Sequence, residues 1–570
     1  MERPQRIPPK VSTDVVRLSY FFFAIWWFII LAVHVVTCLY NAVYAYCYWK
    51  LKTTYLNVCL EFYKIGMPQP YHNAIAITHV VMSAIHGVCI LLMLTGSIWL
   101  RSLAFTPWSS RAVGPEVPTE PTNSFFDRLE AFYDRVTYPF SVFGVKGKYF
   151  EVALISREVV ETALQTVQAY RMSALLPRVL LNRFYVVLLV INCWTSPLID
   201  VAIYKHDKAR RRFVCTVLDC LLDLMASMGI ELIVLLEYVK DYDPKVQGFS
   251  GIIWYNDEWV ARALNEFQMI VVVSWSDLVS RIIFSLGLVV TTLSMRTLIS
   301  RLPRKRNRIL SRADAANTEK WRAYHANSKL LQAAHLMFAV WGFVILGLHI
   351  HASMRPTLPQ CLMQVRPWTA SLPSCYLAGL DCHTLEISGN MQQVQDKWSE
   401  FDASTVVQLL IRHCPELEVP DIFSDFHNLR GVKVYNSTII DWGESAAITN
   451  TNHPQVATLF IVRVNMTDGL LPAGFQSEDF PQSLYDIEIC VTNLRDLPPD
   501  LDHKWLEGAI IQVEYSELRS APLVLARLNP FYLYLTGNPM RELPPEVFEI
   551  GGMVYLGVGD MDISELPPNV

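Results

Sequence analysis

Ionisable side chains lie inside long apolar stretches of the N-terminal half, where a charge is costly. Asp219 and Asp223 are one helical turn apart in one such stretch, and Asp277 and Arg281 are one turn apart in another. Charges within a membrane mark an ion or substrate path by default, unless they pair with each other. We expect Asp277 and Arg281 to pair. For Asp219 and Asp223 both interpretations stay open, so a transporter or channel is one alternative function.

Two pairs of histidines repeat a single spacing in the same half. His72 and His86 are 14 residues apart, and so are His335 and His349. Fourteen residues are about four helical turns, roughly 21 Å, so each pair shares one helix face. In antiparallel helices His72 would face His349, and His86 would face His335. This arrangement resembles the bis-histidine haem pairs of b-type transmembrane cytochromes, which implies a haem oxidoreductase as the least favoured alternative.

Catalytic signatures are missing from the sequence. It contains no phosphate-cradling glycine loop, no Gly-x-Ser-x-Gly elbow, no His-Glu-x-x-His motif, no kinase signature and no Cys-x-x-Cys zinc spacing. We therefore favour a protein that is not an enzyme and that needs no cofactor or metal ion.

Long apolar segments must position the charged and histidine side chains. A mean hydropathy of +0.25, with 52% hydrophobic and 18% charged residues, is too apolar for an ordinary soluble enzyme. The hydrophobic segments long enough to span a bilayer are 18–48, 73–100, 181–204, 213–238, 268–294 and 329–350. They predict a multi-span helical membrane bundle.

Basic loops set the direction of these spans. Short loops rich in Lys and Arg stay in the cytoplasm, which applies to 205–212 and 296–312. The last span then carries the C-terminal part to the extracellular or lumenal side. The N-terminus is also basic, and a seventh crossing at 149–172 would keep it cytoplasmic, with that helix's polar stripe turned into the bundle. Residues 101–148 are predicted to be a polar linker that includes an amphipathic helix at 124–136.

The C-terminal part has the composition of an ectodomain. Residues 353–570 carry 12 Lys and Arg against 28 Asp and Glu, a net charge of −16, whereas residues 1–352 have a net charge of +11. An acidic domain of this kind argues against a nucleic acid partner. Both Asn-x-Ser/Thr sequons, at Asn436 and Asn465, lie in this part and predict glycosylation. Four of its five cysteines could form two disulfides with three possible connectivities, and Cys490 is left over. These four are Cys361, Cys375, Cys382 and Cys414.

A repeated pattern fills the last third of the chain. Apolar triplets such as Leu484, Ile487 and Ile489 recur, and each is followed by an apolar residue and a Leu-Pro step. The apolar residues at 494, 518, 540 and 563 are 24, 22 and 23 residues apart. This pattern resembles the leucine-rich-repeat family, in its 23-residue Leu-Pro subtype, which implies an α/β solenoid with a concave parallel sheet. The asparagine of that family's turn is clear only at Asn538, and Thr492 and Ser516 stand at the equivalent positions.

The predicted organisation follows from these segments. It comprises the cytoplasmic N-terminus with two spans (1–100), the linker (101–148), the remaining membrane helices (149–352), a cysteine-containing cap (353–424) and about six repeats (425–570). No polar capping segment follows the last repeat, so we expect an array that is incomplete at its C-terminal end. The layout is also similar to that of membrane proteins of oomycetes, a resemblance that implies no activity.

Strand alternation predicts the side chains that line the concave sheet. They include Tyr485, Glu488, Gln512, Glu514, Tyr515, Phe531, Tyr532, Tyr534 and Tyr555. Tyrosine provides a large contact area at low entropic cost and is common in binding surfaces, although it also simply suits strands. We therefore expect a membrane-anchored, receptor-like recognition protein that binds a protein or peptide through this face. The oligomeric state stays open.

Overall fold

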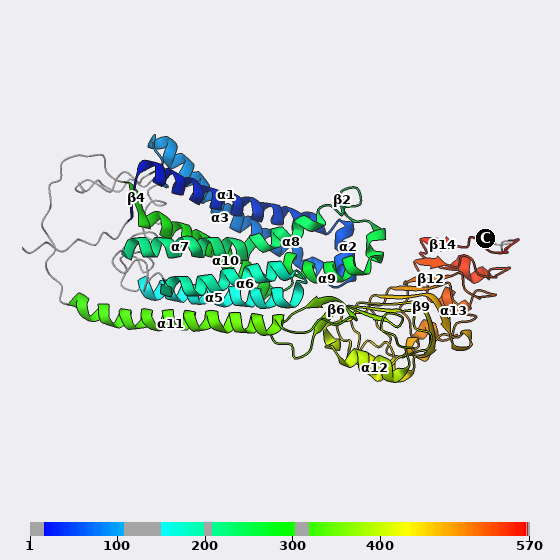
Figure 1. Cartoon of the computed structure of the whole chain (residues 1–570). Coiled ribbons are helices and arrows are strands. Elements are labelled where there is room, and N and C mark those ends of the chain that lie inside the picture. Colours follow the sequence, from blue (N-terminus) through cyan, green and yellow to red (C-terminus); the bar gives the residue numbers. More distant parts are fainter. Residues whose placement is uncertain (1–15, 108–149, 199–207, 302–318, 566, 568–570) are drawn as a thin grey trace, which may run out of the picture.

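The N-terminal half of the chain forms a helical bundle. The computed structural model describes residues 16–107, 150–198, 208–301, 319–565 and 567. In the described residues, long helices pack side by side, with the remaining elements at the two ends (Figure 1). The long helices are α1 (Tyr20–Leu51), α3 (His72–Trp99), α5 (Phe150–Leu175), α6 (Val179–Leu198), α7 (Lys208–Leu224) with α8 (Ile230–Tyr238), α10 (Trp275–Leu298) and α11 (Glu319–Ser353).

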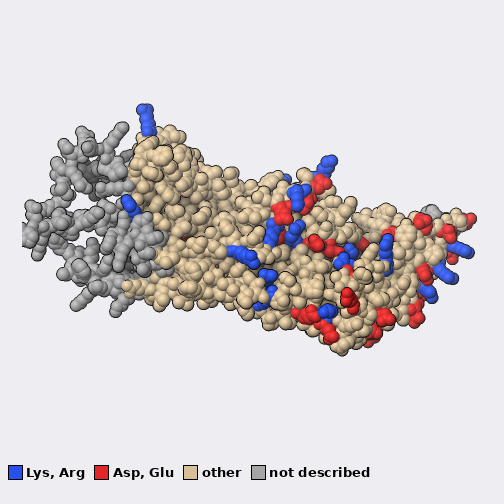
Figure 2. All heavy atoms as spheres, in the orientation of Figure 1, with Lys and Arg blue, Asp and Glu red and all other residues tan. Residues whose placement is uncertain are grey.

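Four of these helices are long and apolar enough to cross a membrane. The qualifying stretches are Tyr20–Leu51, Gln69–Trp99, Trp275–Leu298 and Gln332–Ser353. They confirm the predicted membrane character, and on the face drawn in Figure 2 the middle of the bundle carries neither basic nor acidic side chains. The predicted segments 181–204 and 213–238 also begin as helices, but α6 has a shorter apolar run and α7–α8 carries several acids.

Helix α5 turns its polar stripe into the bundle. Glu161 and Gln165 are buried, whereas Val159 and Val167, on the apolar stripe, are exposed. A soluble amphipathic helix would have the opposite arrangement. The helix packs against α6, α9, α10 and α11, so it belongs to the bundle. The predicted linker and its amphipathic helix at 124–136 lie largely outside the described residues.

Short elements cover the end of the bundle that faces the C-terminal domain (Figure 1). These are α2 (Tyr55–Phe62), the hairpin β2 (Tyr242–Asp243) and β3 (Gly248–Phe249), the 3-10 helix η4 (Gly251–Tyr255) and α9 (Asp257–Ile270). At the opposite end, β1 (Val16–Leu18) pairs with β4 (Ile299–Arg301). The predicted span 268–294 is not one continuous helix, because α9 ends at Ile270 and α10 begins only after Ser274. The Ser274 side chain caps α10 by accepting a hydrogen bond from the Asp277 backbone N–H.

The C-terminal part forms one large sheet. Its strands follow the order β14-β13-β12-β11-β10-β9-β7-β6-β5, with β8 beside β9. Neighbours from β6 to β14 are parallel, and β5 and β6 are antiparallel. The strands are β5 (Cys361–Val365), β6 (Ser374–Asp381), β7 (Gln408–Arg412), β8 (Leu417–Glu418), β9 (Gly431–Asp441), β10 (Thr458–Met466), β11 (Asp486–Cys490), β12 (Ile510–Glu514), β13 (Tyr532–Tyr534) and β14 (Tyr555–Gly557).

Equivalent apolar positions align across the parallel strands. One ladder, in register from strand to strand, contains Ala378, Leu409, Val432, Leu459, Ile487, Ile511, Leu533 and Leu556. All but the last are almost fully buried. The sheet thus extends into 353–424, the range expected to form a cap, and β6 and β7 continue the same ladder as the later strands.

A left-handed residue recurs at the same position in seven successive copies, from β7 to β14. It lies two positions after the second apolar residue that faces the core in each copy, as Val491 does after Ile489. The positive-φ residues are His413, Asn436, Arg463, Val491, Tyr515, Gly537 and Asp560. Thr492 and Ser516 share a hydrogen bond of 2.8 Å, and Asn538 donates to the carbonyls of Val513 and Leu535. Hydroxyl groups therefore hold turns at the positions where asparagine was expected.

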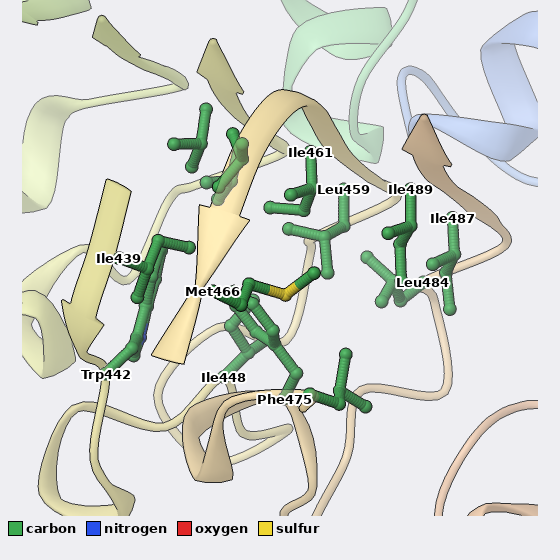
Figure 3. Close-up of a cluster of buried hydrophobic side chains, with 14 of the residues drawn as sticks. Ile439, Trp442, Ile448, Leu459, Ile461, Met466, Phe475, Leu484, Ile487 and Ile489 are labelled. Atoms are coloured by element: carbon green, nitrogen blue, oxygen red, sulfur yellow. The ribbon is translucent and has the colours of Figure 1, made fainter. Parts of the chain in front are cut away.

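Each strand returns through a short helical turn on the far side of the core. These turns are η6 (Asp421–Asp425), η7 (Glu444–Ala446), η9 (Ala473–Phe475), η10 (Leu501–His503), α13 (Leu523–Arg527) and η11 (Pro545–Glu549). Figure 3 shows Trp442, Met466 and Phe475 between strands and turns. The Trp442 and Phe475 rings are 4.7 Å apart, and Trp442 Nε1 donates to the Ala446 carbonyl. One continuous core therefore links all the repeating units.

Two disulfides lie at the start of the sheet. Cys361 pairs with Cys375, joining β5 and β6, and Cys382 pairs with Cys414 just after β6 and β7. The structure therefore confirms the expectation of two bridges and selects one of the three possible connectivities. Cys490 remains a half-buried thiol.

Candidate functional site

One face of the sheet contacts the end of the bundle. We call it the inner face; it contains the side chains that alternate with the buried ladder. On β9 the Lys433 Nζ lies 3.4 Å from both carboxylate oxygens of Asp257 in α9. On β10 the Phe460 ring stacks on Tyr255 of η4, with centroids 5.7 Å apart. The early part of the inner face is therefore occupied by the chain's own membrane domain.

Three of the predicted ligand residues take part in this contact. The Tyr255 hydroxyl donates to Glu488 Oε1 at 2.8 Å, and Gln512 Nε2 donates to the same oxygen at 3.1 Å. Tyr485 lies edge-on to Phe62 of α2, with centroids 6.1 Å apart. Tyr485, Glu488 and Gln512 thus have partners inside the chain. Sequence patterning could not indicate Phe62 and Tyr255, because they come from distant segments, whereas Gln512 contacts its neighbour on the adjacent strand.

The remaining predicted residues form an accessible aromatic surface. We call it the tyrosine patch; it consists of Glu514, Tyr515, Phe531, Tyr532, Tyr534 and Tyr555. Tyr515 and Tyr555 are each 50% exposed, and Phe531 is 42% exposed. The Tyr534 and Tyr555 rings are 5.0 Å apart. Tyr515 packs on Gly537 so closely that a Cβ there would lie 2.3 Å from its ring, and the φ of +72° also favours glycine.

An aspartate lies at the boundary between the covered face and the tyrosine patch. Asp486 Oδ1 is buried without a hydrogen-bond partner among the described residues. Burial, with a smaller contribution from the negative charge of Glu488, raises the pKa of Asp486 to about 8. Near neutral pH this side chain is therefore largely protonated in the folded protein.

The two sequon asparagines lie together. Asn436 and Asn465 are exposed and line one hollow of about 730 Å³ after the strands. Asp381 and His413 line the same hollow, with Asp381 Oδ1 3.1 Å from His413 Nδ1. Both sequons are therefore sterically open to modification, and their glycosylation stays a prediction.

Within the bundle, the predicted Asp277–Arg281 pair belongs to a larger, electrically balanced cluster. Arg281 Nε lies 3.6 Å from Asp277 Oδ2, and its Nη1 lies 2.8 Å from Glu231 Oε2. Arg171 Nη1 contacts Asp277 Oδ1 at 2.7 Å. Tyr44 also donates to Glu231. The two arginines and two acids of this cluster balance in charge. We call it the balanced cluster.

Asp219 and Asp223 contact side chains of α5 and do not belong to the balanced cluster. Arg157 Nη2 lies 3.2 Å from Asp219 Oδ2, and Gln165 Nε2 donates to Asp223 Oδ1 at 3.0 Å. Arg157 also lies 3.2 Å from Glu161, one turn along α5. Sequence reasoning missed Arg157 as a partner, although its spacing from Glu161 is a recognised helix pairing.

The histidines do not form the expected haem geometry. His86 Nδ1 lies 3.0 Å from His34 Nδ1 of α1, and its Nε2 lies 3.2 Å from Ser285 of α10. His72 Nε2 lies 3.0 Å from the Met67 carbonyl. Helix α3 packs against α1 and α10, whereas α11, which carries His335 and His349, packs against α6 and α5. The structure therefore does not bring the predicted pairs together, and the haem expectation is not retained.

Comparison with known proteins does not assign this chain to a family. No protein-family model matches the chain, and no curated protein matches it significantly.

Proposed function

We propose that this chain is a membrane-anchored recognition protein that binds a protein or peptide through the tyrosine patch. In this proposal the parallel sheet is a leucine-rich-repeat solenoid on the extracellular or lumenal side. The aligned apolar ladder and the recurrent left-handed turn residue support a repeating unit of that kind.

The observation that carries the proposal is the uneven cover of the inner face. The bundle contacts Lys433, Phe460 and Glu488, while Tyr515, Phe531 and Tyr555 keep 42–50% of their surface exposed. Clustered exposed aromatic rings are uncommon on a monomer and are typical of interaction surfaces. The patch is thus the part of the inner face that remains available to a partner.

The acidic character of the domain indicates the chemistry of that partner. Glu514 lies within the patch, and residues 353–570 have a net charge of −16. Tyrosine faces and carboxylates together favour a ligand segment with Lys or Arg. Nucleic acid does not fit this charge, and the other partner in the proposal is the lipid bilayer around the bundle.

The arrangement of the helices supports the proposed orientation. The α1 helix begins beside β4, at the end away from the sheet, and α11 leads directly into β5 (Figure 1). If α5, α6 and α7–α8 also cross, seven spans separate the N-terminus from the sheet. The basic residues at 205–212 and 296–312 then belong to the N-terminal side, as the positive-inside rule requires.

Binding tests can use the full chain in lipid nanodiscs and a displayed library of random peptides. Enriched peptides should bind the Y515A/Y532A/Y534A variant roughly 30-fold or more weakly, the loss expected for a hot spot of about 2 kcal/mol. Tyr242→Ala, which removes an exposed tyrosine outside the sheet, is the matched control and should bind normally. If every enriched peptide binds the triple variant and wild type equally, the proposal is wrong.

A further inference from the structure

A second polar cluster in the bundle has an unbalanced charge. It lies between α5, α7 and α10, and contains Arg157, Glu158, Glu161, Asp219 and Asp223. One guanidinium therefore faces four carboxyl groups. The balanced cluster on the same helices has two arginines and two acids. Inside an apolar bundle, excess negative charge must be neutralised by a bound cation or by protons.

Unpartnered oxygens point to where that positive charge binds. Asp223 is 0% exposed, and its Oδ2 has no hydrogen-bond partner in the described part of the chain. Gln165, which holds the other Asp223 oxygen, is 2% exposed, and its Oε1 also lacks a partner there. A buried carboxamide oxygen without a donor is costly, and it is an independent sign of a missing ligand.

Gly287 leaves space beside these oxygens. A Cβ at this position of α10 would lie 3.1 Å from Glu161 Oε1 and 3.8 Å from Asp223 Oδ2. Both carboxylates therefore approach one small volume next to the glycine. Just beyond Asp223, the helix changes to a π-helical stretch at Met225–Gly229, a distortion common at functional sites.

We propose that Glu161, Gln165 and Asp223 bind a monovalent cation, either Na⁺ or a proton, in the middle of the bundle. The described residues contain no grouping of three His, Cys, Asp or Glu side chains that could hold a metal ion, so the proposed ligands are two carboxylates and one amide oxygen. Carboxylate and amide oxygens are hard ligands suited to such cations. The site goes beyond the proposed recognition function and gives the bundle a cation-dependent state of its own.

Several charged or titratable groups surround Asp223. Arg157 and Glu161 come from α5, Asp219 and Cys220 from α7 itself, and Tyr185 from α6, while Glu158 interacts with Arg157, Glu161 and Asp219. From α10 the site receives Gly287 and the neutral Thr291, whose Oγ1 lies 3.2 Å from Arg157 Nη1. Among the described residues only Arg157 is cationic in this group, so the remaining carboxyl groups are left to a bound cation or to protons.

The test measures thermal unfolding of the full chain in nanodiscs. Wild type is compared in sodium chloride and in choline chloride of equal ionic strength, each at acidic and alkaline pH. A sodium site predicts a midpoint roughly 2–4 °C higher in sodium at alkaline pH. A proton site predicts no sodium effect, but a higher midpoint at acidic pH that persists in Asp486→Asn, a variant that removes the pH dependence due to Asp486 in the sheet domain.

Asp223→Asn should abolish the sodium response or, for a proton site, the pH response that remains in Asp486→Asn. For a sodium site, Gly287→Ala should do the same without removing a charge, because its methyl group takes the space beside Glu161. Asp277→Asn, the same chemical change in the balanced cluster, is the matched control and should keep the response. If the Asp486→Asn protein responds to neither sodium nor pH, the proposal is overturned. A sodium response that persists in Gly287→Ala also overturns it, and this readout remains decisive should Asp223→Asn fail to fold. Neither result bears on peptide binding by the tyrosine patch.

Discussion

Backbone conformation at single residues of the sheet domain gives the first prediction. Val491 has a φ of +57° and is 47% exposed. A β-branched residue is disfavoured in this region, whereas asparagine tolerates it. We expect Val491→Asn to raise the free energy of unfolding by about 1 kcal/mol, measured by denaturant unfolding of the sheet domain within the full chain.

Val554→Asn provides the comparison for that substitution. Val554 is also exposed but is not among the positive-φ residues, so no gain is expected there. Equal effects at both positions, or a loss of stability at Val491, would mean that the left-handed backbone at Val491 is not strained.

Protonation of Asp486 makes the stability of the sheet domain depend on pH. Its folded pKa of about 8 exceeds the unfolded value of about 3.9, so the folded state holds a proton that the unfolded state lacks between these values. The free energy of unfolding should therefore decrease as pH rises from about 4 to about 8. Asp486→Asn should flatten this part of the pH profile, measured as unfolding midpoints across the range. A midpoint of wild type that rises over the same interval contradicts this assignment.

The sequence predicted residue contacts only where both partners share one helix. The Asp277–Arg281 pair follows from spacing along α10, and the structure contains it. Arg157 and Arg171 were missed as partners because the acids they contact lie on other helices. The histidine pairs failed for the same reason, since equal spacing on two helices does not make those helices neighbours.

At the scale of elements, the buried ladder should dominate the stability of the sheet. Leu533 in β13 is fully buried between Ile511 and Leu556. Leu533→Ala should lower the free energy of unfolding by about 2–5 kcal/mol, because it removes apolar contact and leaves a cavity. The exposed Val554→Ala should change it by at most about 0.5 kcal/mol. A similar small effect at Leu533 in denaturant unfolding would contradict the continuous core.

Membrane insertion of helix α5 should depend on the apolar stripe that faces away from the bundle. Val167 is 55% exposed, on the side of α5 away from the buried Glu161 and Gln165. Val167→Arg should cost about 2.5–3.5 kcal/mol of insertion energy if that side faces lipid. The measurement is the fraction of chain recovered in carbonate-washed membranes, with Val246→Arg in the loop between β2 and β3 as the control. Full recovery of the Val167 variant would mean that this side of α5 does not face lipid.

Periodicity predicted many elements but not their limits. Strands such as β11 and β13 follow from the repeated apolar triplets, and the four apolar helices follow from hydropathy. The strands β6 and β7 were missed because 31 residues separate their aligned positions Ala378 and Leu409, and α12 (Met391–Ser399) lies between. An interval of that length breaks the 23-residue period on which the prediction relied.

For the whole molecule, the charge distribution of the sequence predicted two distinct halves, but it could not predict which surfaces of the two halves contact each other. The docked surfaces join residues far apart in the chain, such as Tyr255 with Glu488 and Lys64 with the Pro454 carbonyl. A hydrogen-bonded link from Gln512 through Glu488 to Tyr255 connects the edge of the tyrosine patch to the bundle. A ligand bound to the tyrosine patch would thus lie next to the direct contact between the sheet and the membrane domain.

The placement of the two chain ends on opposite sides of the membrane is the central claim, and a topology assay tests it most directly. Tags at both termini are probed before and after selective permeabilisation, with a glycosidase treatment analysed on the same blot. The account predicts that the C-terminal tag lies on the side opposite the N-terminal tag. It also predicts a glycosidase-sensitive mass that is lost in the N436Q/N465Q variant. A C-terminal tag on the cytoplasmic side, with no glycosidase shift, would contradict the account.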